Sequence, residues 1–549
     1  MILTPTQVWA EYDPQAQDPR ISFVRYEKNA QGNTQWDARM DGERVADGAV
    51  RIRVQGFFPS DYDGKHALVY VSDRHGELPF RELHDLLTQG FALIAFDYVG
   101  AREGVDAYTV YPQSLAYANY AQAGEHLTTA EPTARDTSIF VWAKVCRSVL
   151  RFARRMCGAD CQMYLLGVRE GADIAWQVAA TDPQVAGLIA FLHAGWQEYA
   201  SVPRFSGRAL DMNDERERWL TGCATQAYAK FVKVPTLFVG TSNNAVTSFD
   251  RLDNTLALVR EQAPLRQSIA HGLNDSVDAC ALTTAAEWLR CVAQGSQMPA
   301  NPTLSLTIED GKVYATAVAD AAQEIERIAI YYNLDEIHSG VRSWRLIEVS
   351  AAAPRAEIPV PSGEHCVFAY VSVHYKGGYR LSSVLMNLSV DEDALPDAAP
   401  LRKRPIVFER KNGASLWIAE GTDPYRTYPL PQITAGGLDI MGISAEAGDL
   451  STYVIGELSD QVAEEKLLQF DVYAAEERSL AIELTAEQDS GYVTYRANVM
   501  LKGGEWSKVA LELQEFKNAD RISLKSWNKV KKLTFVQVSG AVFNNILWV

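Results

Sequence analysis

A change in the spacing of apolar residues near position 297 constrains the fold of this chain more than any other feature. Before it, short apolar runs alternate with helix-length segments, which is typical of a parallel sheet covered by helices on both faces. After it, helical spacing gives way to short alternating runs. We therefore expect a multidomain chain in which a doubly wound, mostly parallel α/β sheet is followed by two all-β sandwich domains.

The spacing also predicts individual elements of the α/β part. Strands are expected at 66–72, 91–98, 162–168, 186–195, 234–240 and 265–271. Helices are expected at 77–90, 139–156, 170–182, 248–262 and 278–294.

Breaks in composition predict the boundaries between units. The stretch GSQMPANP, which begins at 295, and the stretch VDEDALPDAAPLRKRP, which begins at 390, both have the proline content of linkers. The expected units are a turn-rich arm or lead-in strand at 1–45, an α/β unit at 46–297, a β-sandwich at 298–395 and a jelly roll at 396–549.

Charge and composition exclude several classes of function. With 52 basic and 69 acidic residues the formal net charge is −17, which repels phosphate backbones and anionic lipid, so we expect neither nucleic acid nor membrane as a partner. No run approaches the ~20 apolar residues of a membrane helix, and the first residues lack the pattern of a signal peptide. Seven cysteines, an odd number, fit reduced thiols in the cytoplasm. No cofactor motif or metal-ligand spacing is present, so neither group is expected.

Residues 46–297 resemble the α/β-hydrolase superfamily, particularly its acetyl xylan esterase and dienelactone hydrolase branch. Three segments carry the resemblance: HALVYVSDRHG from 66, QGFALIAFDYVGAREG from 89, and LLGVREGADIAWQVAA from 165. The last of them lies where the family has its nucleophile elbow. That strand-to-helix turn is too sharp for side chains two residues before and after the nucleophile, and the family motif is therefore G-x-S-x-G.

The residues at the catalytic positions of the family differ in this chain. Gly167 and Gly171 keep the elbow spacing, but the residue between them is Arg169, which has no nucleophilic oxygen or sulfur. The loop where the family carries its acid offers the amides Asn243 and Asn244, which cannot stabilise an imidazolium as a carboxylate does. Of the triad only His271 is left, so we expect no ester hydrolysis by the family mechanism.

An intact elbow without a nucleophile leaves two hypotheses for Arg169. In the first, Arg169 and His271 hold a carboxylate or phosphate ligand, because a guanidinium at a helix N-terminus is an anion site. In the second, Arg169 forms an ion pair with Glu170 or Asp97 and simply fills the old pocket. The candidate ligand-binding residues are Arg169, Glu170, His75, Asn243, Asn244, His193 and Trp196.

The segment VTYRANVMLKGGEWSKVALELQEFKNA from 493 has a Gly-Gly turn and a Trp at the start of the next strand, and FNNILWV from 543 forms a last strand. With these features the last 150 residues resemble galactose-binding-like jelly rolls, and the preceding unit of short alternating runs resembles fibronectin type III or immunoglobulin-like domains. The resemblance implies sugar binding by aromatic rings that stack on sugar CH faces. Core packing is the competing interpretation for each ring. The candidate platform residues are Trp417, Tyr425, Tyr428, Trp506 and Trp527.

Three functions remain open from the sequence. The leading one is a non-catalytic protein that binds a carbohydrate-related or anionic small ligand, such as an oligosaccharide. The alternative is a carbohydrate-ester or lactone hydrolase in which His271 activates water and Asp275 or Asp278 orients it. In the third, the chain is an interaction module and its β units form a homo-oligomer.

Overall fold

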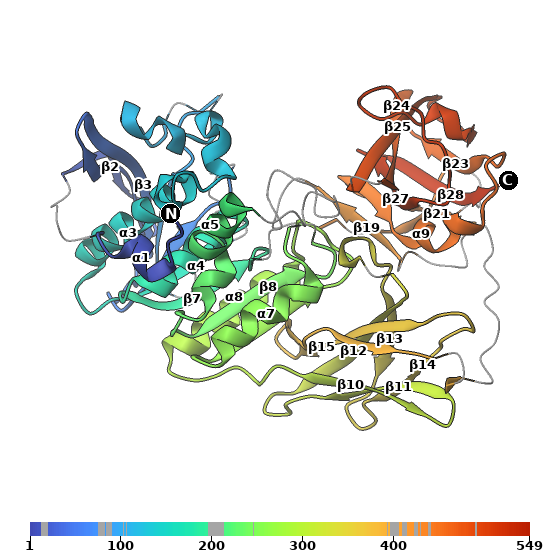
Figure 1. The fold of residues 1–549 in the computed structure, drawn as a ribbon, viewed down its shortest axis with the longest axis horizontal. Coiled ribbons are helices and arrows are strands. Elements are labelled where there is room, and N and C mark those ends of the chain that lie inside the picture. Colours follow the sequence, from blue (N-terminus) through green and yellow to red (C-terminus); the bar gives the residue numbers. More distant parts are fainter. Residues whose placement is uncertain are drawn as a thin grey trace.

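Three structural parts follow one another along the chain in the computed structural model (Figure 1). We call them the N-terminal unit (residues 1–297), the middle β unit (298–391) and the C-terminal β unit (406–549). The structure describes the chain except for residues 13–19, 75–82, 84–89, 103, 106, 196–212, 245, 337, 392–393, 396–405, 409–413, 415, 422–426, 429, 437–440 and 489–490. The helix predicted at 77–90 therefore lies almost entirely outside the described residues.

The N-terminal unit is built on a nine-stranded sheet in the order β1-β2-β3-β5-β4-β6-β7-β8-β9. Its strands are β1 (Ile21–Lys28), β2 (Thr34–Val45), β3 (Gly48–Phe58), β4 (His66–Val71), β5 (Ala92–Phe96), β6 (Gln162–Val168), β7 (Val185–Phe191), β8 (Thr236–Thr241) and β9 (Leu265–Ala270). The six strands from β5 to β9 in this order are parallel, and β1, β2 and β3 join them antiparallel. The strands expected from 66 to 271 are present within a few residues.

In the described part of residues 1–45, strands β1 and β2 belong to the nine-stranded sheet. Strand β2 pairs along its length with β3, and Trp36, Ala38 and Met40 on it are buried in the core of the N-terminal unit. A lead-in strand was expected here, but the expected boundary at 45 falls in the turn between two strands of one sheet.

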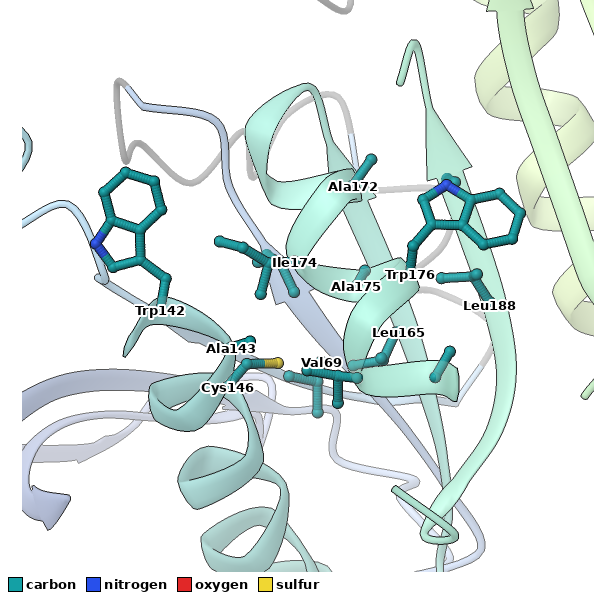
Figure 2. Packing of buried hydrophobic residues seen from close by; sticks show 14 of the residues in the cluster. Val69, Trp142, Ala143, Cys146, Leu165, Ala172, Ile174, Ala175, Trp176 and Leu188 are labelled. Carbon is teal, nitrogen blue, oxygen red and sulfur yellow. The ribbon is translucent and has the colours of Figure 1, made fainter. Parts of the chain in front are cut away.

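The helices of the N-terminal unit are α1 (Pro5–Trp9), α3 (Ser138–Cys157), α4 (Glu170–Thr181), α5 (Asp214–Gly222), α6 (Thr225–Ala229), α7 (Phe249–Arg260) and α8 (Ala279–Ala293). Helices α3 and α4 pack on one face of the sheet, where Cys146 of α3 lies beside Val69 of β4 and Ala175 of α4 lies beside Leu165 of β6 (Figure 2). The opposite face is covered by α8 and shares its apolar core with the middle β unit. Because side chains alternate along a strand, β4 sends Val69 to the first face and Leu68 to the second.

The middle β unit contains a three-stranded sheet, β10-β11-β14, and a five-stranded sheet of β13, β12, β15, β16 and β17, all antiparallel. Its strands are β10 (Thr303–Glu309), β11 (Lys312–Val318), β12 (Ile325–Leu334), β13 (Arg345–Val349), β14 (Arg355–Ile358), β15 (Cys366–Tyr375), β16 (Tyr379–Ser382) and β17 (Met386–Ser389).

Strand β16 of the middle β unit covers the edge of the nine-stranded sheet at β9. The Ile269 N–H donates to Ser382 Oγ at 3.0 Å, and Arg380 Nε donates to Ser268 Oγ at 3.2 Å. An exposed sheet edge is a site for unwanted pairing between chains. Contact with the middle β unit therefore protects this edge and fixes the two units together.

The C-terminal β unit consists of two further antiparallel sheets, one of five strands in the order β19-β22-β27-β24-β25 and one of six that includes β21, β28, β23 and β26. Its elements are β18 (Ile406–Phe408), β19 (Trp417–Glu420), β20 (Gln432–Thr434), β21 (Met441–Ser444), β22 (Asp449–Thr452), α9 (Val454–Leu458), β23 (Leu468–Ala474), β24 (Arg478–Gln488), β25 (Gly491–Leu501), β26 (Trp506–Leu511), β27 (Val530–Val536) and β28 (Ala541–Trp548). One apolar core lies between the sheets.

Two further findings concern the cysteines and the possibility of a membrane-spanning helix. All seven cysteines are free thiols. Among the helices in the described residues, none has the length and apolar character needed to cross a bilayer.

Candidate functional site

The turn between β6 and α4 has the sharp geometry of an elbow. Arg169 sits on it with φ 52° and ψ −121°, a strained backbone conformation for a residue with a side chain. A Cβ added to Gly167 would lie 2.4 Å from the Gly171 carbonyl oxygen, and one added to Gly171 would lie 2.2 Å from the Ser72 carbonyl oxygen. Both glycines are therefore required by close approach of backbone, as the motif predicts.

This packing makes Gly171 sensitive to the smallest substitution. We expect Gly171→Ala to lower the free energy of unfolding by about 1–3 kcal/mol, because the methyl group meets backbone that cannot rotate away. Urea unfolding of the full chain measures the change. Unaltered stability would contradict the tight contact between α4 and the end of β4.

The guanidinium of Arg169 is held between two carboxylates. Its Nη1 lies 3.0 Å from Asp73 Oδ2, in the loop after β4. Its Nη2 lies 3.0 Å from Asp275 Oδ2 and donates to the Asp275 carbonyl oxygen at 2.7 Å, in the loop after β9. The side chains of Arg169 and Asp73 are each only 9% exposed, and that of Asp275 is 48% exposed.

An ion pair of Arg169 was one of the two hypotheses, but the partners differ from those expected. Asp97 pairs instead with Arg102 at 2.8 Å and accepts the backbone N–H of Thr109 at 2.7 Å. Glu170 is the first residue of α4 and does not bind the guanidinium of its neighbour in any contact shown by the structure. With two carboxylates around one guanidinium, an added anion would meet compensating negative charge rather than a free cation.

His271 lies at the interface with the middle β unit. Its ring stacks on Tyr331 of β12, with centroids 4.5 Å apart and planes at 18°. Burial, together with the nearby charge of Arg380, lowers the pKa of His271 to about 4. In the described part of the chain its ring makes no hydrogen bond.

The carboxylates that could orient His271 have other partners. Asp278 receives two hydrogen bonds from the Arg380 guanidinium, at 2.8 and 3.0 Å, and accepts the Ala281 N–H as the N-cap of α8. Asp275 pairs with Arg169. The arrangement that the hydrolase alternative needs, a histidine hydrogen-bonded to an acid, is not formed at His271.

Asn243 and Asn244 are both fully buried and act as structural links. Asn243 accepts the Trp344 indole N–H and donates to the Arg342 carbonyl oxygen, each at 2.8 Å, and so fastens the loop to the middle β unit. Asn244 donates to the Asn274 carbonyl oxygen and accepts two backbone N–H groups of its own turn. Both side-chain amides, which were expected at the position of the family's acid, are thus hydrogen-bonded to other groups of the protein.

His193 forms a buried dyad behind the elbow. Its Nδ1 lies 2.8 Å from Asp173 Oδ2, and the Thr225 hydroxyl donates to the other carboxylate oxygen at 2.7 Å. Burial lowers the pKa of His193, but the Asp173 carboxylate outweighs this effect and the pKa lies above its usual range. With 4% exposure, His193 is a satisfied core residue. His75 and Trp196 lie outside the described residues.

The aromatic residues considered as sugar platforms differ in how exposed they are in the structure. Trp417 and Trp527 are 4% and 0% exposed in the core of the C-terminal β unit, in agreement with the core-packing interpretation of these two rings. Trp506 is partly exposed at the start of β26, and its indole N–H donates to the Ala435 carbonyl oxygen at 3.1 Å. Tyr428 is also partly exposed, whereas Tyr425 lies outside the described residues.

The C-terminal β unit reaches the His271 loop through Glu420, which sequence reasoning did not identify. Its carboxylate accepts the Asn274 N–H at 2.8 Å and the Ser276 hydroxyl at 3.3 Å. Burial raises its pKa, and Lys532 opposes that shift. No local sequence signal marks Glu420 or Asp73, because each acts on a loop far away in the chain. Among the described residues, no group of His, Cys, Asp and Glu is arranged to hold a metal ion.

Comparisons with known proteins concern the fold. No protein-family model and no curated protein sequence matches the chain. An acetyl xylan esterase from Paenibacillus sp. R4 is 16% identical over 53% of this chain and 92% of its own, with a TM-score of 0.37. Acetyl xylan esterase 1 from Thermoanaerobacterium sp. JW/SL YS485 is 16% identical over 49% and 86%, with a TM-score of 0.34.

A third solved structure is similar to this chain to a comparable extent. A putative dienelactone hydrolase from Klebsiella pneumoniae is 13% identical over 47% of this chain and 88% of its own, with a TM-score of 0.29. Similarities of this size say nothing about activity. The strand order of the nine-stranded sheet and the glycine-framed elbow are the observations that agree with a hydrolase-like N-terminal unit.

Proposed function

We propose that this chain is a non-catalytic binding protein with an α/β-hydrolase-like N-terminal unit, and that its ligand is a carbohydrate-related small molecule. The observation that carries the proposal is the ion-paired Arg169 at the elbow position. A guanidinium cannot act as a nucleophile, and this one is paired with two carboxylates, one of which, Asp73, is only 9% exposed.

The loops around the elbow support the same proposal. Asn243, Glu420 and Tyr331 connect them to the two β units, so residues that could serve chemistry instead hold the three units together. Of the two ligand classes considered, a neutral carbohydrate is favoured over an anion because Asp73 and Asp275 surround the guanidinium. The proposal includes a fibronectin-like middle β unit and a galactose-binding-like C-terminal β unit, in agreement with their antiparallel sheets.

Hydrolysis of p-nitrophenyl acetate tests the non-catalytic part of the proposal. We expect the wild type and His271→Ala to release p-nitrophenol at the same rate as buffer, because no nucleophile occupies the elbow and His271 lacks an orienting carboxylate. A rate above buffer that His271→Ala abolishes would overturn the proposal and favour the hydrolase with a rearranged site.

Titration calorimetry of the full chain tests the ligand class. We expect heat of binding with neutral xylo- or cello-oligosaccharides and none with inorganic phosphate. The reverse result would restore the anion hypothesis for Arg169. Size-exclusion chromatography of the full chain in the same buffer tests the remaining prediction, a homo-oligomer formed through the β units.

A further inference from the structure

A cavity of about 370 Å³ opens between the two β units. One wall comes from the middle β unit, between the end of β12 and the start of β13, together with the segment that joins β14 to β15. The other wall comes from Tyr453, α9 and the start of β27 in the C-terminal β unit. Cavities of roughly 300–1,000 Å³ are typical of small-molecule sites, which form preferentially where domains meet.

Two ion pairs join the walls of this junction cavity. Lys531 Nζ lies 2.8 Å from Glu336, and Arg345 pairs with Glu457. Each pair takes one partner from each β unit, and all four residues line the cavity. Their side chains are between 16 and 34% exposed, so their polar groups remain accessible from within.

The wall from the middle β unit is fixed from behind. Arg342, whose side chain is fully buried, donates from Nε to the Glu336 carbonyl oxygen at 2.8 Å and pairs with Asp250 of α7 at 2.8 Å. Asp335 adopts φ 54° and its carboxylate accepts the backbone N–H groups of residues 365 and 366 at 2.7 and 2.6 Å. The cavity is therefore preformed, and a ligand need not order it at an entropic cost.

Charge on the lining selects the ligand class. Four acidic residues line the cavity, Asp335, Glu336, Glu364 and Glu457, against two basic ones, Arg345 and Lys531, which leaves a formal charge of −2. This balance disfavours anions. Positively charged donors and negatively charged acceptors lie close together in this lining, and charged groups form strong hydrogen bonds with hydroxyl groups.

The same lining offers surfaces for the apolar faces of a sugar ring. Pro359 and Pro361, between β14 and β15, are exposed and partly exposed, whereas Tyr332 and Tyr453 on opposite walls are only 5% and 6% exposed and are closed to ring stacking.

We propose that the junction cavity binds a neutral saccharide of one or two rings, held by the two ion pairs and by the proline faces. This inference rests on the proposed function and names its site. It places the ligand between the β units, away from the elbow of the N-terminal unit.

Titration calorimetry of the full chain with xylobiose and with cellobiose, compared with glucuronate, tests the site. The cavity variant is Glu336→Gln with Lys531→Gln, which removes both charges together and so leaves neither one unpaired. The matched control is Arg327→Gln with Glu348→Gln, which removes an exposed 2.8 Å ion pair within the middle β unit that does not line the cavity. We expect the cavity variant to bind the disaccharides about tenfold more weakly or worse, because charge-assisted hydrogen bonds are lost, and the control to bind like the wild type.

The outcomes separate the site from the function. Disaccharide binding that is weakened in the cavity variant alone supports the site. Equal binding by the wild type and both variants overturns the site but leaves the proposed function standing, whereas no binding of any saccharide by the wild type overturns both. Tighter binding of glucuronate than of cellobiose contradicts the charge argument. If the cavity variant unfolds at the assay temperature, Glu457→Gln on the opposite wall replaces it and is read in the same way.

Discussion

Arg169→Met is expected to lower the free energy of unfolding by about 3–5 kcal/mol, because the substitution leaves carboxylates of a buried ion-pair cluster without their cation. Asp73 is the partner that matters most, since its side chain is 9% exposed and cannot recover its hydration where it lies. Asp275 is 48% exposed and loses less, since water can replace part of the contact. Urea unfolding of the full chain, followed by tryptophan fluorescence, measures the change.

Two further variants distinguish the loss of charge compensation from the loss of side-chain packing. Arg169→Met combined with Asp73→Asn removes the stranded charge together with its cation, so we expect it to recover part of the lost stability. Arg327→Met removes one partner of an exposed ion pair, at 42 and 55% exposure, and is expected to cost no more than about 1 kcal/mol. If Arg169→Met is no worse than Arg327→Met, Arg169 is not clamped between Asp73 and Asp275, and the non-catalytic proposal loses its main support.

The partners of Arg169 show where sequence reasoning stops. It predicted the strand at 162–168 and the helix from 170 accurately, because apolar spacing and the elbow glycines are local signals. The expected ion-pair partners, Glu170 and Asp97, were a neighbour in sequence and a residue in a segment of the family resemblance. The actual ones come from loops 96 and 106 residues away, which meet at the elbow because the carboxyl ends of parallel strands share one edge of the sheet.

The aromatic residues of the C-terminal β unit show a second limit. Trp417 and Ala419 face the core from β19, while Ile418 and Glu420 face the other way, toward the loop that contains Gly272 and Asn274. A four-residue strand carries too few alternations for the sequence to tell which face is buried. The contact of Glu420 with the His271 loop depends on how the C-terminal β unit docks on the N-terminal unit, and no sequence motif encodes that docking.

Acid is expected to destabilise the chain in a way that depends on His271. Its pKa is lowered to about 4 in the folded protein, whereas an unfolded histidine has its ordinary value of about 6.5. The unfolded state therefore binds the proton first, so the stabilisation is complete above about pH 6.5 and is lost as the pH falls toward 4. For His271 the loss amounts to about 2–3 kcal/mol.

His374, whose pKa burial lowers to about 3, acts in the same direction. The raised pKa of His193 acts in the opposite direction, since its contribution is present at low pH and is lost as the pH rises.

His271→Phe isolates this effect, because a phenyl ring can keep the stack on Tyr331 but cannot take up a proton. We expect the unfolding free energy of this variant to fall less steeply than that of the wild type between about pH 6.5 and pH 4, and that of His365→Phe, at an exposed position just before β15, to follow the wild type. The same measurement bears on catalysis. A general base works best with a pKa near the pH at which it acts, and a histidine near 4 is far too weak a base at neutral pH. A wild-type slope no steeper than that of His271→Phe would mean that this histidine titrates normally, and a base for the hydrolase alternative would then be present.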